Sequence, residues 1–320
     1  MKIAFVGKGG SGKTTLAGSF LAYCENEGKR LLAIDADLNM HLAELLGFLE
    51  PSQEKHISHP AAVERIKKYL IGENMRIASP AHFKKTTPPG KGSRLLRIGQ
   101  SDPILDHFAK RRDNTQFVVV GTYSEEGIGM SCYHNNLGIL ENMLSHTPAE
   151  DAVVVVDMVA GVDAFANSLH SQFDLMVIVV EPTRRSLDVF SQYLALAREA
   201  GVADTLIAVG NKVRSDEDRV FISTAIQCEK LLGFFSESSY LEAHDRIGGP
   251  LEIEKIETEN KDLLALLFAK AESNIADPDA RLAMLHALHR RYVSQPFIAE
   301  RFGDLSGQID PDFSYRQKFV

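Results

Sequence analysis

The sequence predicts an α/β fold with a single doubly wound, mostly parallel sheet and helices on both of its faces. Short apolar runs rich in valine and isoleucine alternate with longer stretches of helical periodicity. The runs are almost continuously apolar, which is typical of parallel strands that are covered on both faces. The expected strands are Ile3–Val6, Leu31–Ile34, Phe117–Val120, Val153–Asp157, Leu175–Val180 and Leu206–Gly210.

Helical patterns lie between these runs and indicate how the chain is divided. Helices are expected at Thr14–Glu27 and at Arg185–Ala200. Residues 1–259 are expected to form one domain that carries an insertion at residues 50–114. Residues 260–320 are then expected to form a helical C-terminal extension packed on that domain.

The insertion and the extension have weaker patterns than the rest of the chain. In the insertion we expect one helix, Ala61–Leu70, and two short strands, Met75–Ala78 and Leu95–Ile98. The extension begins with leucines at helical spacing, but its last stretch, Phe297–Val320, has no periodicity and is expected to be an irregular tail.

Two histidines in the extension, His286 and His289, are three residues apart on an expected helix. A metal-binding pair is one interpretation of this spacing, and a solvated helix face is the interpretation that we favour.

The composition argues against several classes of protein. The chain has 35 basic and 43 acidic residues and a formal net charge of −8, so nucleic acid is not an expected partner. The basic runs Lys110–Arg112 and Arg184–Arg185 are expected to be solvated. The cysteines Cys24, Cys132 and Cys228 are odd in number and far apart, which fits a reducing compartment. We expect a cytoplasmic protein without a membrane anchor, since no apolar stretch approaches the length of a spanning helix.

The strongest motif is Gly7–Thr15, which reads Gly-Lys-Gly-Gly-Ser-Gly-Lys-Thr-Thr between an expected strand and an expected helix. Its glycines allow a tight turn whose N–H groups face one concavity, and the helix N-terminus adds positive partial charge. The motif therefore predicts a P-loop NTPase, with Lys13 on the β- and γ-phosphates and the Thr14 hydroxyl on Mg²⁺. The expected nucleotide-binding residues of this loop are Gly9, Gly10, Ser11, Gly12, Lys13, Thr14 and Thr15.

A second lysine, Lys8, stands earlier in the loop than an ordinary P-loop requires. This form of the loop resembles the deviant Walker A family, which includes MinD, ParA, the arsenical-pump ATPases and the nitrogenase iron protein. In that family the early lysine reaches across a dimer interface to the partner's nucleotide. The resemblance implies an ATP-dependent homodimer in which Lys8 acts in catalysis beside Lys13, whereas the sequence itself shows only a cation beside a phosphate site.

Acidic residues follow two of the expected strands. Asp35 and Asp37 are two residues apart, so both are expected at the carboxyl edge of the sheet, where ligands bind. Asp157 closes a run of valines, as a Walker B aspartate does, and is expected to hold Mg²⁺. The family resemblance implies that Asp37 orients the attacking water, that Asp35 lies in the outer shell around Mg²⁺, and that Gly161 belongs to switch II and senses the γ-phosphate.

The nature of the base is indicated by Asn211 and Lys212, which follow another expected strand. They resemble the Asn-Lys base-reading motif of the same family, and the Asn211 amide can both donate to and accept from adenine. Arg214 stands where guanine-binding proteins have an aspartate. The expected ligands are therefore ATP or ADP with Mg²⁺.

The segment from Gly127 to Asn135 resembles the metal loop of the nickel-insertion ATPases of carbon monoxide dehydrogenase. In those proteins two cysteines from each subunit bind a metal at the dimer axis. Here Met130 replaces the first cysteine and only Cys132 remains, so a site with four thiolates cannot form from this loop. His134 is a candidate for the missing ligands, giving a possible dimer-axis metal site of Cys132 and His134 from both subunits.

The resemblance implies a dimeric ATPase switch that acts on an unidentified client protein, with metallocentre maturation as one role. The alternative is a spatial-positioning ATPase like MinD or ParA, which the negative charge argues against. The cysteine count argues against an electron-transfer reductase. A kinase for a small substrate remains an open interpretation of the loop. Hydrolysis is expected to be slow and to be stimulated by dimerisation or by a partner.

Overall fold

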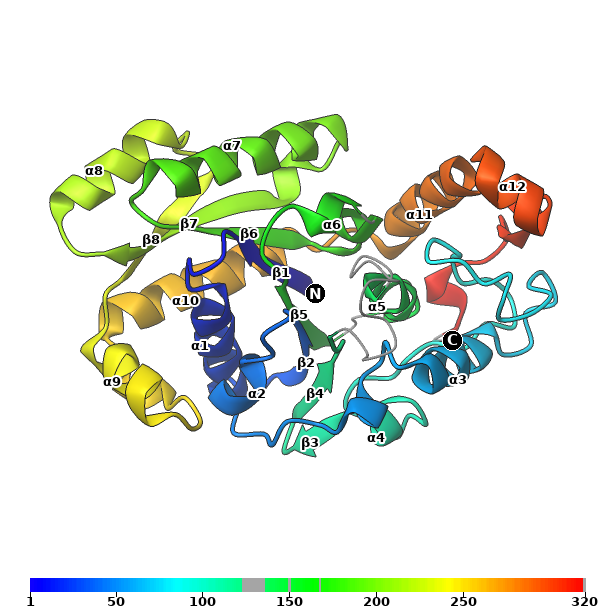
Figure 1. The fold of residues 1–320 in the computed structure, drawn as a ribbon, viewed down its shortest axis with the longest axis horizontal. Helices are drawn as coiled ribbons and strands as arrows, with labels where there is room; N and C mark the ends of the chain where they lie inside the picture. Colours follow the sequence, from blue (N-terminus) through cyan, green and yellow to red (C-terminus); the bar gives the residue numbers. More distant parts are fainter. Residues whose placement is uncertain (123–135, 149–150, 167, 319–320) are drawn as a thin grey trace.

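A computed structural model describes residues 1–122, 136–148, 151–166 and 168–318. In this part of the chain eight strands form one sheet, in the order β3-β4-β2-β5-β1-β6-β7-β8 (Figure 1). All neighbouring strands are parallel except β3, which pairs antiparallel with β4 at one edge. The strands are β1 Lys2–Gly7, β2 Arg30–Ala36, β3 Lys110–Arg112, β4 Thr115–Val119, β5 Ala152–Met158, β6 Leu175–Val180, β7 Leu206–Val213 and β8 Leu231–Ser236.

Helices connect the strands and cover the sheet. Among the described residues none of them is long and apolar enough to cross a membrane. They are α1 Lys13–Asn26, α2 Leu42–Leu45, α3 Pro60–Ile71, α4 Leu105–Phe108, α5 Leu137–Ser145, α6 Asp163–Ala166, α7 Arg184–Glu199, α8 Asp216–Ala225, α9 Ser239–Ile247, α10 Thr258–Ser273, α11 Pro278–Val293 and α12 Pro296–Phe302.

The sheet has a hydrophobic core on each face, which confirms the doubly wound prediction. Successive residues of β1 alternate between the two cores, since side chains of a strand point to opposite faces in turn. Ile3 and Phe5 pack with α1 and α10, whereas Ala4 and Val6 pack on the side of α3, α5 and α7. Both faces of the strand are therefore apolar, and this produces the continuous apolar runs in the sequence.

Two strands have no counterpart among the expected ones. Lys110–Arg112 was expected to be a solvated run, but it is the edge strand β3, whose charged side chains remain partly or fully exposed. Charged residues are common on edge strands because they oppose pairing with other chains. The other is β8, whose Leu231–Ser236 run contains Gly233 and is only partly buried, so its apolar pattern is weak.

The insertion contains its expected helix, since α3 spans Pro60–Ile71, but the two short strands are absent from it. Met75–Ala78 and Leu95–Ile98 are irregular in backbone structure. Their apolar side chains still enter a core: Ile77 is buried beside α3 and α5. These segments bury apolar side chains although they pair with no strand, and their sequences therefore resemble those of strands.

The last part of the chain is more ordered than expected, because α12 begins at Pro296 and the residues after it contact the insertion. The Thr87 hydroxyl lies 3.0 Å from Gln308 Oε1, and the Lys91 N–H donates to Asp310. The prediction of an irregular tail over Phe297–Val320 is thus wrong for the helix and for these packed residues.

The two histidines of α11 are buried, so the prediction of a solvated helix face is also wrong. His289 is fully buried, and its Nδ1 lies 3.0 Å from the Thr86 hydroxyl in the insertion. Burial lowers its pKa to about 4, so the ring is neutral at physiological pH. His289 is therefore a packing residue between α11 and the insertion.

A buried carboxyl group in α5 generates a prediction about stability. Glu141 is 1% exposed, and burial raises its pKa to about 7 from a usual 4.5, although Lys85 and Ser168 oppose the shift. The folded chain thus binds this proton more tightly than the unfolded chain. The resulting stabilisation is complete below pH 4.5 and is lost as the pH rises through 7.

We expect Glu141→Gln to be more stable than the wild type by about 1–3 kcal/mol near pH 8, and the difference to shrink near pH 5. Urea unfolding across this range measures it. Glu199→Gln, at the exposed end of α7, is the control. A Glu141→Gln effect that does not vary with pH would contradict the assignment.

Candidate functional site

The glycine-rich loop connects β1 to α1 at the carboxyl edge of the sheet. Gly12 precedes the first residue of α1 and has a left-handed φ of 90°, which a residue with a side chain rarely adopts. A Cβ on Gly12 would also lie 2.2 Å from Nδ2 of Asn211. A Cβ on Gly7 would lie 2.7 Å from the Val179 carbonyl oxygen. Both glycines are therefore required by close packing of the loop against β6 and β7.

Asn211 and Lys212 hold this loop from the neighbouring strand. They lie within β7, which continues to Val213 and so extends past the expected end at Gly210. Asn211 Nδ2 donates to the Ser11 carbonyl at 2.7 Å, and Lys212 Nζ donates to the Gly10 carbonyl at 2.6 Å. The Asn211 amide retains its oxygen and one N–H, so a base-reading role is still chemically available to it.

A residue that the sequence analysis gave no role, Glu181, joins the two exposed lysines of the site. It follows β6 directly, and its carboxylate lies 3.6 Å from Lys8 Nζ and 3.0 Å from Lys212 Nζ. Glu181 is at the carboxyl end of a central strand, and that position was the signal that could have identified it. The side chain of Lys8 is thus held in place by an ion pair with Glu181 of the same chain.

The acidic residues converge on the start of α1. Lys13 Nζ lies 3.7 Å from Asp37, and both side chains are largely buried. Asp35 is fully buried and accepts hydrogen bonds from the N–H groups of Asp37 and Leu42, so it fixes the turn after β2. Asp157 lies opposite Asp35 in the β2–β5 register.

Asp157 has an unusually high pKa for an aspartate. Burial raises its pKa to about 7 and the charge of Asp37 adds to the rise, whereas Thr14 and Lys13 oppose it. Burial also raises the pKa of Asp35, and the charge of Asp157 is the next cause. Thr14 is close, yet neither oxygen of Asp157 has a hydrogen-bond partner in the described part of the chain.

A buried carboxylate without a hydrogen-bond partner is suited to bind a cation, and a nucleotide bound at the loop would bring such a cation with its phosphates. No group of three His, Cys, Asp or Glu residues in the described ranges is arranged to enclose a metal. Mg²⁺ does not need one, because it commonly uses one or two protein oxygens together with phosphate and water. Asp157 and the Thr14 hydroxyl are the residues here that would hold it.

Gly161 is connected directly to the phosphate-binding loop. Its N–H donates to the Gly7 carbonyl at 3.3 Å, and its φ of 102° favours glycine. The Tyr193 hydroxyl donates to the Gly161 carbonyl from α7. The Gly161 N–H is therefore engaged with β1 in this conformation, and it would have to leave Gly7 to contact a phosphate.

The site opens into a cleft of about 990 Å³. One wall is the loop and the turn after β2, as expected from the sequence. The end of α9, with Ile247 and Gly248, also lines the cleft, and the sequence analysis missed it. Glycines after a helical pattern, at 248 and 249, were the available signal for a turn here. The lining residues include Gly9, Gly10, Gly12, Lys13, Thr14, Thr15, Asp37, Lys212, His244, Arg246, Ile247 and Gly248.

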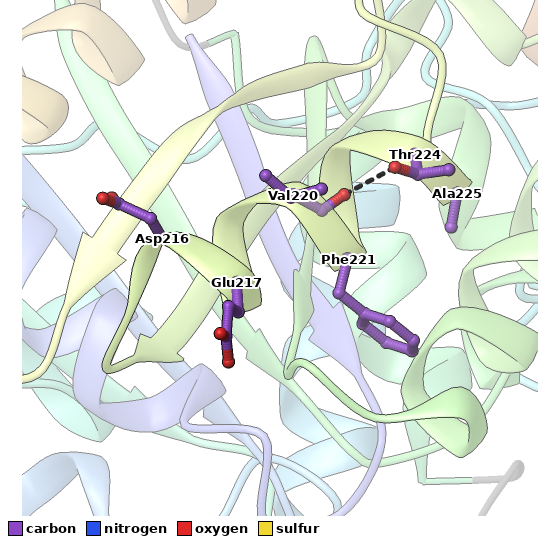
Figure 2. A pocket seen from close by; sticks show the side chains of 6 residues that line it. All are labelled: Asp216, Glu217, Val220, Phe221, Thr224 and Ala225. Atoms are coloured by element: carbon purple, nitrogen blue, oxygen red, sulfur yellow. Dashed lines mark hydrogen bonds between the residues drawn. The ribbon is translucent and has the colours of Figure 1, made fainter.

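A second hollow lies on the outer face of α8 (Figure 2). It is lined by one helix only, with exposed Val220 and Phe221 between acidic residues and Thr224. The acidic residues are in the first turn of α8, where they complement the helix dipole. None of the residues that line this hollow is cationic and two are acidic, so the cleft at the loop is the candidate nucleotide site.

The proposed metal loop is not part of this description. Met130, Cys132 and His134 lie outside the described residues, so the prediction of a dimer-axis metal site stays a prediction.

Known proteins share this loop and this fold. A family model for the CobQ/CobB/MinD/ParA nucleotide binding domain matches residues 3–242. The chain is 31% identical over 249 residues to the carbon monoxide dehydrogenase accessory protein CooC of Rhodospirillum rubrum, covering 78% of this chain and 88% of that protein. It is 30% identical over 259 residues to an uncharacterized ATP-binding protein of Methanocaldococcus jannaschii, covering 79% and 92%.

Solved structures support the fold assignment. The cell division ATPase MinD of Pyrococcus furiosus matches with a TM-score of 0.54 and 18% identity, covering 86% of this chain and 99% of that one. A ParA family ATPase of Chlorobium tepidum has a TM-score of 0.54 and 16% identity, covering 84% and 96%. The resemblance inferred from the loop is confirmed, and the chain belongs to the CobQ/CobB/MinD/ParA family of P-loop nucleotide-binding proteins.

Proposed function

We propose that this chain is an ATP-hydrolysing molecular switch that dimerises when it binds ATP and acts on a client protein. The observation that carries the proposal is the position of Lys8. Lys8 belongs to the phosphate-binding loop, but its side chain pairs with Glu181 and it is not among the residues that line the cleft. A cation placed at the rim is available to a second subunit's nucleotide, as the family resemblance implies.

The catalytic assignments are part of the same proposal. In this proposal Lys13 binds the β- and γ-phosphates and Asp37 orients the attacking water, and the distance of 3.7 Å between the two side chains supports both roles. Thr14 and Asp157 would hold Mg²⁺, which would neutralise charge on the phosphates. Asp35 supports this site from the outer shell.

The remaining assignments concern the γ-phosphate and the adenine base of the nucleotide. The Gly161 N–H contacts the γ-phosphate after leaving Gly7, which couples nucleotide state to the loop after β5. Asn211 and Lys212 position the loop and face the adenine side of the cleft. Ile247, which is 83% exposed and lines the cleft, provides an apolar surface for the base.

The client proposed for this switch is a metalloenzyme, because a relative that matches most of the chain is an accessory protein of carbon monoxide dehydrogenase. Co-sedimentation with DNA or with lipid vesicles in the presence of ATP would instead indicate the spatial-positioning role of MinD and ParA.

The first prediction separates nucleotide binding from hydrolysis. Asp37→Ala should bind ATP but hydrolyse it at least about a hundredfold more slowly, since a positioned group of this kind contributes that much or more. The variant should therefore accumulate as an ATP-bound dimer, measured by light scattering after size exclusion. Adding Lys8→Ala should return it to a monomer. Hydrolysis at the wild-type rate by Asp37→Ala would refute the water-positioning role, and a dimer that survives Lys8→Ala would refute the role of Lys8.

The second prediction concerns pH. Mg²⁺ binds the carboxylate form of Asp157, so Mg²⁺-dependent ATP affinity should increase as the pH rises towards its pKa of about 7. The increase is at most about tenfold per pH unit. Asp157→Asn should bind Mg²⁺-ATP more weakly and lose this part of the dependence. Calorimetry of both proteins measures it, and the titration of ATP itself is common to both. Parallel pH profiles would exclude Asp157 as the ligand.

The third prediction tests the loop with one cysteine. If Cys132 and His134 of two subunits form a metal site, the ATP-bound dimer of Asp37→Ala should carry about one zinc or nickel ion, and Cys132→Ser should lose it. Elemental analysis of the purified dimer decides this. A content below about a tenth of an ion per dimer would show that Cys132 is not a ligand.

A further inference from the structure

The insertion and the last residues of the chain form a single surface. Leu95 of the insertion forms a small apolar core with Leu282 of α11 and with Phe313 and Tyr315 near the end of the chain. Hydrogen bonds join Lys91 to Asp310 and Gln308 to the His82 carbonyl. Figure 1 shows α3, α11 and α12 together at one end of the molecule, away from α8 and α9.

A cluster of cations lies on this surface, where α3, the insertion loop and α12 meet. Lys84 Nζ lies over the ring of Phe302, and the Arg301 guanidinium is 5.2 Å from the centroid of the same ring. Lys67, from α3, lies close enough to Lys84 for its charge to act on it. We call Lys67, Lys84 and Arg301 the basic cluster.

The basic cluster has no internal counter-ion. None of its members forms an ion pair with a carboxylate of the described ranges, whereas Lys68, the neighbour of Lys67, pairs with Glu64 at 2.7 Å. The pKa of Lys84 is lowered to about 8, by burial first and then by the charges of Lys67 and Arg301. Within the described surface, the repulsion is offset by the aromatic face of Phe302 and by the Ala81 carbonyl, which accepts a hydrogen bond from Lys84 Nζ at 2.6 Å, and neither group carries a negative charge.

The basic cluster is bordered by an exposed apolar side chain. Phe297 is 60% exposed and precedes Arg301 by one helical turn, so both lie on the same side of α12. A surface that combines two partly buried lysines and an exposed arginine with an exposed aromatic ring complements an acidic segment that also carries apolar side chains.

We propose that the basic cluster, with Phe297, binds an acidic segment of a partner protein. A protein fits better than a nucleic acid, because three cations would neutralise few phosphates and the chain carries a net charge of −8. If this partner is the client of the proposed switch, that identification depends on the proposed function. The binding itself does not, since the basic cluster shares no residue with the nucleotide cleft.

The test measures binding of a short fluorescein-labelled peptide of glutamates interspersed with leucines, with a glutamine version of the same peptide for comparison. Fluorescence anisotropy at low and high salt is recorded for the full chain. We expect the acidic peptide to bind, the glutamine peptide to fail, and high salt to weaken binding. The double variant Lys84→Gln/Arg301→Gln should bind about tenfold more weakly, as expected for two lost ion pairs of exposed type.

Two further variants make the outcome decisive. Lys68→Gln removes a neighbouring charge that is already paired, so it should bind like the wild type. Arg301→Glu changes a single exposed residue, so it should fold even if the double variant does not. It should also lose binding to the acidic peptide. ATP binding should be unchanged in these three variants, because the basic cluster shares no residue with the nucleotide cleft.

Three results would overturn the proposal. They are failure of the wild type to bind the acidic peptide at low salt, equal binding by the wild type and Arg301→Glu, and equal losses in Lys68→Gln and the double variant. Binding to phosphatidylserine vesicles or to single-stranded DNA, without binding to the peptide, would assign the basic cluster to a membrane or to nucleic acid and would equally overturn it.

Discussion

The burial of several carboxyl groups next to one another is the constraint on which the site depends. Asp35 and Asp157 are fully buried on adjacent strands, Asp37 is close by, and Lys13 is the cation that the described loop directs at them. Burial first, and then the charges of neighbouring carboxylates, raise the pKa of Asp35 and of Asp157, so ionising this cluster costs free energy in the folded chain. A divalent ion would lower this cost, so the Mg²⁺ site that we propose at Thr14 and Asp157 would draw part of its affinity from it.

The surrounding contacts keep this charged site in one geometry. The bond from Asn211 to the Ser11 carbonyl joins residues that are 200 positions apart in the chain. Lys212 and Glu181 brace the same loop from β7 and from the end of β6. Because β1 lies between β5 and β6, the loop after β1 is reached from strands on both sides, and each of them contributes a polar residue at its carboxyl end.

Much of the fold and of the phosphate site could be predicted, because the interactions involved are local or periodic. The strands β1, β2, β4, β5, β6 and β7 are buried on both faces and so leave an apolar run, and the loop has a fixed spacing. The edge strand β3 has no apolar pattern, because its residues are partly solvated. Glu181 and Ile247 owe their places to the order of strands and to the position of α9, and neither is encoded by a short motif.

The insertion shows the complementary difficulty. His289 and Gln308 are polar, and only contacts with Thr86 and Thr87 reveal why they are buried. A solvated helix and an irregular tail were reasonable interpretations of those residues in isolation. The structure makes the insertion and the end of the chain a single packed unit, which no pattern within either segment indicates.

That unit has a consequence for synthesis of the protein on the ribosome. The contact between Arg76 and Asp310 joins residues 234 positions apart, and the contact between Gln308 and His82 joins residues 226 apart. The loops of the insertion therefore emerge long before their partners do. During translation the apolar residues of these loops, such as Leu95, stay exposed to solvent until the residues that bury them have been synthesised. A chaperone would be most needed in this interval.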